Sequence, residues 1–162
     1  MSPLDSVMWG LSVVGRGGLS WIVITTVLVA FRRLPVRALV SLALALLLAS
    51  VAVDRVLKPL VGRHRPFVTA PDIPVIGDRP ADASWPSGHA ANAFAGAYVL
   101  SAVAPQARAL WWALAFAIAY SRVYVGVHYP YDVIAGGAIG AVCAAIVMKW
   151  TARSRIDRSL KR

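Results

Sequence analysis

Glutamate is missing from this sequence of 162 residues, and its seven acidic residues are all aspartate. Charged residues of both signs make up only 15% of the chain, whereas 59% of the residues are hydrophobic. A soluble domain of this length would be unable to bury so much apolar surface, but a lipid bilayer accepts it. The composition therefore predicts a single membrane-embedded domain over residues 1–162 and disfavours an apolar soluble helical bundle.

Cysteine is nearly absent as well. The single Cys143 lies inside an apolar stretch, which excludes a disulfide framework and a thiolate metal cluster. The aspartates show no spacing typical of metal ligands. The first apolar stretch has no basic segment before it and no obvious cleavage site, so we expect no cleaved signal peptide.

The net charge of +10 raises the question of a nucleic-acid partner. The basic residues lie between apolar runs and form no patch on a polar domain, so we expect the bilayer, and no nucleic acid, as the partner. The basic tail at residues 151–162 is predicted to be cytoplasmic. It either contacts anionic inner-leaflet lipid or only determines the topology.

The apolar residues gather in stretches without charge, at 17–31, 38–53, 90–107, 109–121 and 133–148. Each is somewhat shorter than the roughly 20 residues that cross a hydrocarbon core, but flanking Arg, Lys and Tyr side chains can reach the interface. We therefore predict an all-α, integral-membrane helical bundle of about five transmembrane helices, near residues 17–33, 36–57, 88–104, 107–126 and 130–150. Residues 1–16 mix polar and apolar side chains and predict a short interfacial helix.

The distribution of basic residues predicts the orientation. With the N-terminus outside, ten Lys and Arg residues lie on the inner side and seven on the outer side. The loop at residues 58–86 is then extracytoplasmic. It contains six of the ten prolines and no helical period, and a loop of this length is usually functional or disordered.

Three polar clusters stand at the outer ends of the predicted helices, where charges are costly and tend to mark function. Their sequences are Lys58-Pro-Leu-Val-Gly-Arg-His-Arg65-Pro66, Pro86-Ser87-Gly88-His89, and Ser121-Arg122 followed by His128 and Asp132. Lys58, Arg65 and Arg122 would suit a tetrahedral dianion if they met at one point. Ser87 and Gly88 precede a helix whose free N–H groups favour an anion.

The two histidines in these clusters can divide the chemistry of phosphate transfer. His128 and Asp132 are four residues apart, so the carboxylate can orient the imidazole and leave its other nitrogen ready to attack phosphorus. His89 lies beside the anion site and can protonate the leaving oxygen. Arg63 and His64 are assigned only to the outer rim, and Asp54 and Arg55 are expected to form a surface ion pair.

These clusters resemble the three-part signature of the type 2 phosphatidic acid phosphatase superfamily, Lys-x6-Arg-Pro, Pro-Ser-Gly-His and Ser-Arg-x5-His-x3-Asp, at every position between residues 58 and 132. The resemblance implies a phospho-histidine intermediate on His128, with Asp132 as its partner and His89 as general acid and then base. It implies that Lys58, Arg65, Ser87, Gly88 and Arg122 hold the phosphoryl oxygens, with no metal and no other cofactor. Familiar members have six spans and we predict five here, without the first, which leaves association into a homo-oligomer open.

The resemblance implies a phosphatase in the cell membrane, multi-pass, with its site on the extracytoplasmic side and a lipid phosphate or diphosphate as substrate. A polyprenyl diphosphate is the first choice. A phosphatidylglycerophosphate or a decaprenyl-phosphoryl-pentose phosphate is the alternative. Two other classes of protein are disfavoured. A vanadate-dependent haloperoxidase would be large and soluble. A membrane scaffold or binding protein would not need His89, His128 and Asp132 together. The role of the loop at 67–85 stays open.

Overall fold

The computed structural model describes the backbone of residues 2–160 and the side chains of residues 2–152, and every regular element in it is helical. The predicted basic tail at 151–162 thus falls largely outside the described side chains. The longer helices are α1 (Pro3–Val14), α2 (Leu19–Ala30), α3 (Arg37–Ser50), α6 (Gly88–Val103), α7 (Arg108–Tyr124) and α8 (Pro130–Leu160). The short elements are η1 (Arg16–Gly18), η2 (Val51–Leu57), α4 (Lys58–Val61), α5 (Pro66–Thr69) and η3 (Pro105–Ala107).

Local sequence signals account for several helix ends. Ser2 and Asp5 form a reciprocal capping box at the start of α1, and Ser87 caps α6. Pro130 opens α8, where a missing backbone N–H leaves no hydrogen bond unmade. Gly62 takes a left-handed conformation directly after α4, which ends that helix.

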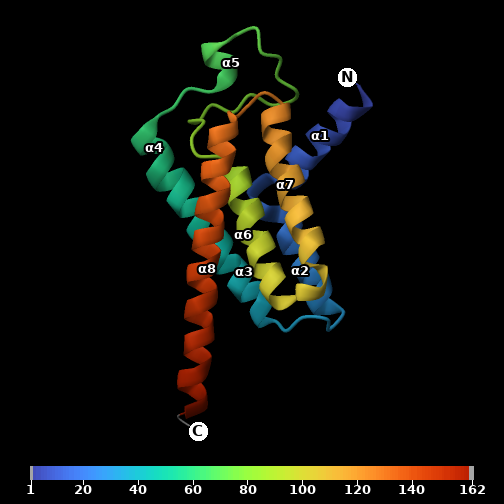
Figure 1. The fold of residues 1–162 in the computed structure, drawn as a ribbon, viewed down its shortest axis with the longest axis vertical. Helices are drawn as coiled ribbons and strands as arrows, with labels where there is room; N and C mark the ends of the chain where they lie inside the picture. Colours follow the sequence, from blue (N-terminus) through green and yellow to red (C-terminus); the bar gives the residue numbers. More distant parts are fainter. Residues whose placement is uncertain (1, 161–162) are drawn as a thin grey trace.

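Helix α6 runs through the centre of the bundle, with α3, α7 and α8 packed around it (Figure 1). Its buried positions are mostly alanine and glycine, which allows neighbouring backbones to come close. A Cβ atom at Gly140 of α8 would collide with the backbone carbonyl of Ala91 in α6. The small residues that the sequence shows in α6 and α8 therefore set the distance between these two helices.

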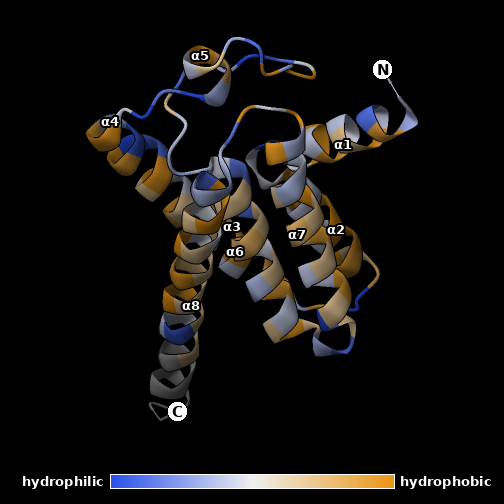
Figure 2. Ribbon diagram, turned by 45° about the horizontal axis from the view of Figure 1, so that its top comes forward, coloured by the Kyte–Doolittle hydropathy of each residue, from blue (hydrophilic) through white to orange (hydrophobic). Residues whose placement is uncertain are grey.

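Hydrophobic residues predominate along the helices of the bundle (Figure 2). Large side chains such as Leu47, Leu110, Phe116, Ile134 and Ile146 are more than half exposed. Exposed apolar side chains of this size and number are unfavourable in water, but they suit contact with lipid chains. The apolar outer surface agrees with the predicted integral-membrane bundle.

Length and composition identify fewer spans than the five predicted. Among the described residues, Arg37–Thr69 and Pro130–Ala152 are long and apolar enough to cross a membrane, and Pro3–Val14 with Arg16–Ala30 forms a third candidate bent by 54°. Helices α6 and α7 have 16 and 17 residues, fewer than the roughly 20 of an ordinary span. All five predicted segments are nevertheless helical, and the helix expected at 1–16 is present as α1.

The segment at residues 58–86 joins α3 and η2 to α6 across one end of the bundle, at the top of Figure 1. It contains the single-turn helices α4 and α5, and residues 70–87 have no regular helix. The segment lies over the ends of α6, α7 and α8, where the three polar clusters lie.

Candidate active site

The predicted site residues all come from helix ends or the adjoining turns. Lys58 begins α4 and Arg65 precedes α5, while Ser87, Gly88 and His89 stand at the start of α6. Arg122 is in the last turn of α7, His128 is in the turn after it, and Asp132 is in the first turn of α8. Two backbone hydrogen bonds join these parts, from Ser87 N to Asp132 O at 2.9 Å and from His128 N to Arg122 O at 3.3 Å.

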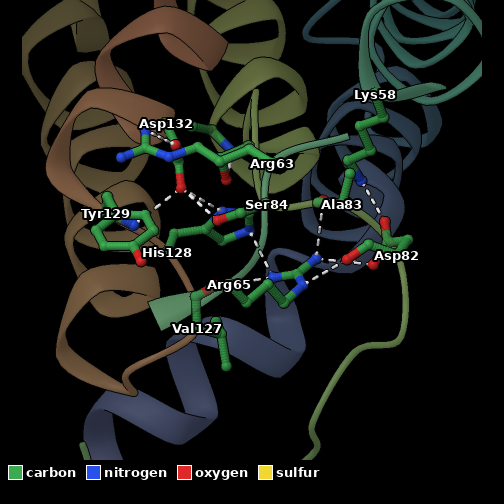
Figure 3. A network of polar contacts seen from close by, with 12 residues as sticks. Lys58, Arg63, Arg65, Asp82, Ala83, Ser84, Val127, His128, Tyr129 and Asp132 are labelled. Atoms are coloured by element: carbon green, nitrogen blue, oxygen red, sulfur yellow. Dashed lines mark hydrogen bonds and ion pairs between the residues drawn. The ribbon is translucent and has the colours of Figure 1, made fainter. Parts of the chain in front are cut away.

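Asp132 is fully buried and is surrounded by donors (Figure 3). Its Oδ2 accepts hydrogen bonds from Ser84 Oγ at 2.5 Å and from the backbone N–H of Tyr129 at 2.9 Å. Its Oδ1 accepts from Arg63 Nη1 at 2.9 Å. These contacts hold the carboxylate in one orientation, with Oδ2 3.5 Å from His128 Nδ1. That distance is longer than an ordinary hydrogen bond, so the two groups interact electrostatically in this geometry.

The other ring nitrogen of His128 faces the opposite way. Nε2 lies 3.4 Å from Arg65 Nη1, which also donates to Val127 O at 2.8 Å. Burial lowers the pKa of His128 to about 4, against the effect of Asp132 and with the help of the charges of Arg65 and Arg122. His128 is therefore neutral near pH 7, and an Nδ1–H directed toward Asp132 leaves the lone pair on Nε2.

Lys58 and Arg65 are joined by a carboxylate that the sequence analysis did not assign to the site. Asp82 Oδ2 lies 2.5 Å from Lys58 Nζ, and Asp82 Oδ1 lies 2.7 Å from Arg65 Nη2 (Figure 3). Partial burial by itself raises the pKa of Asp82, but the hydrogen bonds and charges of Lys58 and Arg65 lower it to about 2. The carboxylate is thus ionised at any ordinary pH.

Residues at the start of α6 also contribute to the site. A Cβ atom added to Gly88 would lie 3.3 Å from Asp54 Oδ1 and 3.8 Å from Lys58 Nζ, so the Gly88 backbone lies close to the cation. His89 Nε2 is buried and has no hydrogen-bond partner among the described residues. The side chain of Ser87 caps the helix by accepting from Ala90 N at 3.5 Å.

Two cavities meet at His89. The larger, of about 1300 Å³, is lined by Lys58, Arg65, Gly88 and His89 among others. The smaller, of about 250 Å³, is lined by His89 and Arg122. Arg122 is 5% exposed, contacts the hydroxyl of Ser12, and leaves its Nε without a partner in the described part of the chain. The structure thus gathers the predicted residues at one end of the bundle, where His89 lines both cavities.

Some contacts differ from those that the sequence predicted. Arg63 was assigned to the rim, but it pairs with buried Asp132 and stacks 4.1 Å over the Tyr129 ring. Asp54 pairs with Lys58 at 2.7 Å, not with Arg55, because residues four apart share a helix face and adjacent residues do not. Ser84 and Asp82 precede the Pro-Ser-Gly-His motif closely, which is the only sequence signal that could have indicated them. No group of three or more His, Cys or Asp side chains within residues 2–152 could hold a metal ion.

Comparisons with known proteins identify the family of this chain. The model of the PAP2 superfamily matches residues 34–156. Undecaprenyl-diphosphatase of Sulfolobus acidocaldarius is 35% identical over 149 residues, which cover 87% of this chain and 68% of that protein. Decaprenylphosphoryl-5-phosphoribose phosphatase of Mycobacterium tuberculosis is 36% identical over 139 residues, which cover 85% of this chain and 75% of that protein.

A solved structure shares the fold. The crystal structure of Aquifex aeolicus LpxE aligns with a TM-score of 0.78 at 31% identity, over 92% of this chain and 88% of that chain. The similarity in sequence and fold extends over most of the chain and includes all three polar clusters. The family predicted from those clusters is confirmed, and the chain belongs to the PAP2 superfamily as a membrane lipid phosphatase.

Proposed function

We propose that this phosphatase removes the terminal phosphate of a polyprenyl diphosphate through a phospho-histidine intermediate on His128. The observation that carries the proposal is the position of His128, with Nδ1 toward the buried carboxylate of Asp132 and Nε2 toward the guanidinium of Arg65. An imidazole held in this way has one nitrogen oriented by a carboxylate and the other directed at a cationic, anion-binding region.

The first step forms a bond between His128 Nε2 and phosphorus and breaks the bond from phosphorus to the bridging oxygen. His89 donates a proton to that oxygen, and the lipid monophosphate leaves. In the second step water attacks phosphorus, His89 accepts its proton, and the bond from phosphorus to Nε2 breaks. Inorganic phosphate is released and His128 is regenerated.

Charge stabilisation provides the rest of the catalysis in this proposal. Lys58, Arg65 and Arg122 neutralise the phosphoryl oxygens, and the N–H groups near Ser87 and Gly88 donate to them from the start of α6. The bond from phosphorus to the bridging oxygen hydrolyses slowly unaided, so an oriented nucleophile and pre-placed cations are the effects required. Arg63 and Ser84 act through Asp132, which they hold in place.

The wall of the larger cavity contains polar side chains that suit a polar leaving group. Asn92, one turn after His89 on α6, is 4% exposed and accepts a hydrogen bond from Ser50 Oγ at 3.2 Å. Both side chains line the cavity, beside the apolar residues Leu47 and Val51. This surface favours a second phosphate near His89 and a hydrocarbon tail further along, as in a polyprenyl diphosphate. The similarity to undecaprenyl-diphosphatase supports the same substrate class.

More Lys and Arg residues lie on the side of the bundle opposite the site than on the side of the site. This excess supports an extracytoplasmic site in the cell membrane. The substrate tail would lie in the bilayer, and the head group would reach the cavity from it. We propose one catalytic domain over residues 1–162.

The test of the mechanism is the variant His128→Ala in purified, detergent-solubilised protein. We expect phosphate release from undecaprenyl diphosphate to fall by about 10³-fold or more, since the nucleophile is lost. Expression and helix content should be unchanged. His64→Ala replaces an exposed histidine and should retain most of the activity. Full activity in His128→Ala would refute the covalent mechanism.

The similarity to a decaprenylphosphoryl-5-phosphoribose phosphatase favours a second candidate, a polyprenyl-phosphoryl pentose phosphate. Its leaving group is also polar, so the Asn92 surface suits it as well. Values of kcat/KM for undecaprenyl diphosphate, this pentose phosphate and phosphatidylglycerophosphate separate the candidates. We expect the highest value for the diphosphate.

A further inference from the structure

The carboxylate of Asp82 holds the position that the proposed function gives to phosphoryl oxygens. Its two oxygens bind the Lys58 ammonium at 2.5 Å and the Arg65 guanidinium at 2.7 Å. The backbone oxygen of Asp82 also accepts from Arg65 Nε at 2.8 Å. A carboxylate and a phosphate present similar pairs of anionic oxygens to such donors. The same N–H groups cannot serve both anions at once.

The cations in this arrangement are anchored and the carboxylate is not. Arg65 is 4% exposed and donates to Val127 O at 2.8 Å, and Lys58 also pairs with Asp54 at 2.7 Å. The side chain of Asp82 is 51% exposed, on a segment without regular helix between α5 and α6. When the anions exchange, Asp82 can therefore swing into solvent while Lys58 and Arg65 keep their places.

We propose that Asp82 is an internal competitor for phosphate, which leaves Lys58 and Arg65 when the lipid substrate binds and returns to displace inorganic phosphate after hydrolysis. This inference rests on the proposed function, in which those two cations bind the phosphoryl group. Displacing Asp82 lowers the binding free energy of every phosphate ligand by the same amount. The lipid substrate offsets this loss of binding free energy through contacts of its apolar tail, whereas inorganic phosphate makes no such contacts. The carboxylate therefore limits product inhibition and leaves substrate binding adequate.

Binding of inorganic phosphate to Asp82→Asn tests this inference without any turnover. Isothermal titration calorimetry of the full chain in detergent at pH 7.5 would compare this variant with the wild type. Loss of one competing charge beside two cations should lower the Kd for phosphate by about tenfold. Asp72→Asn, which neutralises an exposed aspartate in the same segment, should leave the Kd unchanged.

A second variant guards against an effect of the asparagine amide itself. Asp82→Ala removes the side chain and should tighten phosphate binding in the same direction. If both variants bind phosphate as the wild type does, or more weakly, the inference is overturned, because the carboxylate then only orders Lys58 and Arg65. The same conclusion follows if the inhibition constant for phosphate during lipid hydrolysis does not fall in Asp82→Asn.

The proposed function can fail separately. If the wild type releases no phosphate from any lipid but Asp82→Asn still binds phosphate more tightly, the catalytic proposal fails. Asp82 then remains the internal competitor of an anion-binding site.

Discussion

His128 shows how one residue depends on groups from several parts of the chain. Burial and the charges of Arg65 and Arg122 lower its pKa to about 4, although Asp132 acts in the opposite direction. The proposed nucleophile needs a neutral imidazole, which is the form present above that pKa. Protonation below it would occupy the attacking lone pair, so on the acid side activity should be lost as the pH falls through about 4.

A ¹³C NMR titration of labelled histidines in the detergent-solubilised protein would measure this pKa, with the signal assigned by its loss in His128→Gln. We expect His128 to titrate well below 6.5. In Asp132→Asn the pKa should fall further, since the group that raises it is removed. A midpoint for His128 near 6.5 in the wild type would contradict the assigned environment.

The sequence predicted the contact between two proposed site residues but not the groups that support them. The spacing of four residues predicted the contact of His128 with Asp132, although His128 lies in the turn before α8 and not on that helix. The support of Asp132 by Arg63 and Ser84 spans 69 and 48 positions of the chain, and no local spacing indicates it. Arg63 was consequently expected at the rim.

At the scale of elements, the contact between α6 and α8 holds two of the three clusters together. Gly136 and Gly140 of α8 lie against the carbonyl groups of Ser87 and Ala91 in α6. The close approach also allows Ser87 N to bond Asp132 O at 2.9 Å. Separating these helices would therefore disturb the site as well as the packing.

The variant Gly140→Val tests this contact. Its side chain would meet backbone atoms of Ala91, which cannot rotate away, so the helices must shift. We expect a loss of about 2–4 kcal/mol of stability and a lower Tm in detergent, measured by circular dichroism. Gly10→Ala is the matched control, because a Cβ atom there meets nothing within 4 Å. An equal Tm for Gly140→Val and wild type would show that the contact does not limit the packing.

At the scale of the whole molecule, all three clusters lie at one end of a bundle whose outer surface is apolar. We predict that this end is extracytoplasmic. In a Cys143→Ser background, His64→Cys should react with a membrane-impermeant maleimide in right-side-out membrane vesicles. Arg33→Cys, in the turn at the opposite end, should react only after the membrane is opened. The reverse labelling pattern would place the site on the cytoplasmic side.

The sequence by itself determined the class of molecule and indicated the groups that we propose to react. Its apolar content exceeds what a small soluble domain can bury, and its three motifs contain the histidines, cations and carboxylate of the proposed chemistry. Composition and the spacing of residues within each motif are enough for both conclusions, because neither depends on how distant parts of the chain pack together.

Only the tertiary structure decided how those groups are partnered. The contact of Asp82 with Lys58 spans 24 positions, and that of Arg65 with His128 spans 63. Such pairs form where the path of the chain returns to the same end of the bundle, and that path follows from the packing of α6 against α3, α7 and α8. The helix lengths also differed from the charge-free stretches, because caps, turns and the η2 segment set where each helix begins and ends.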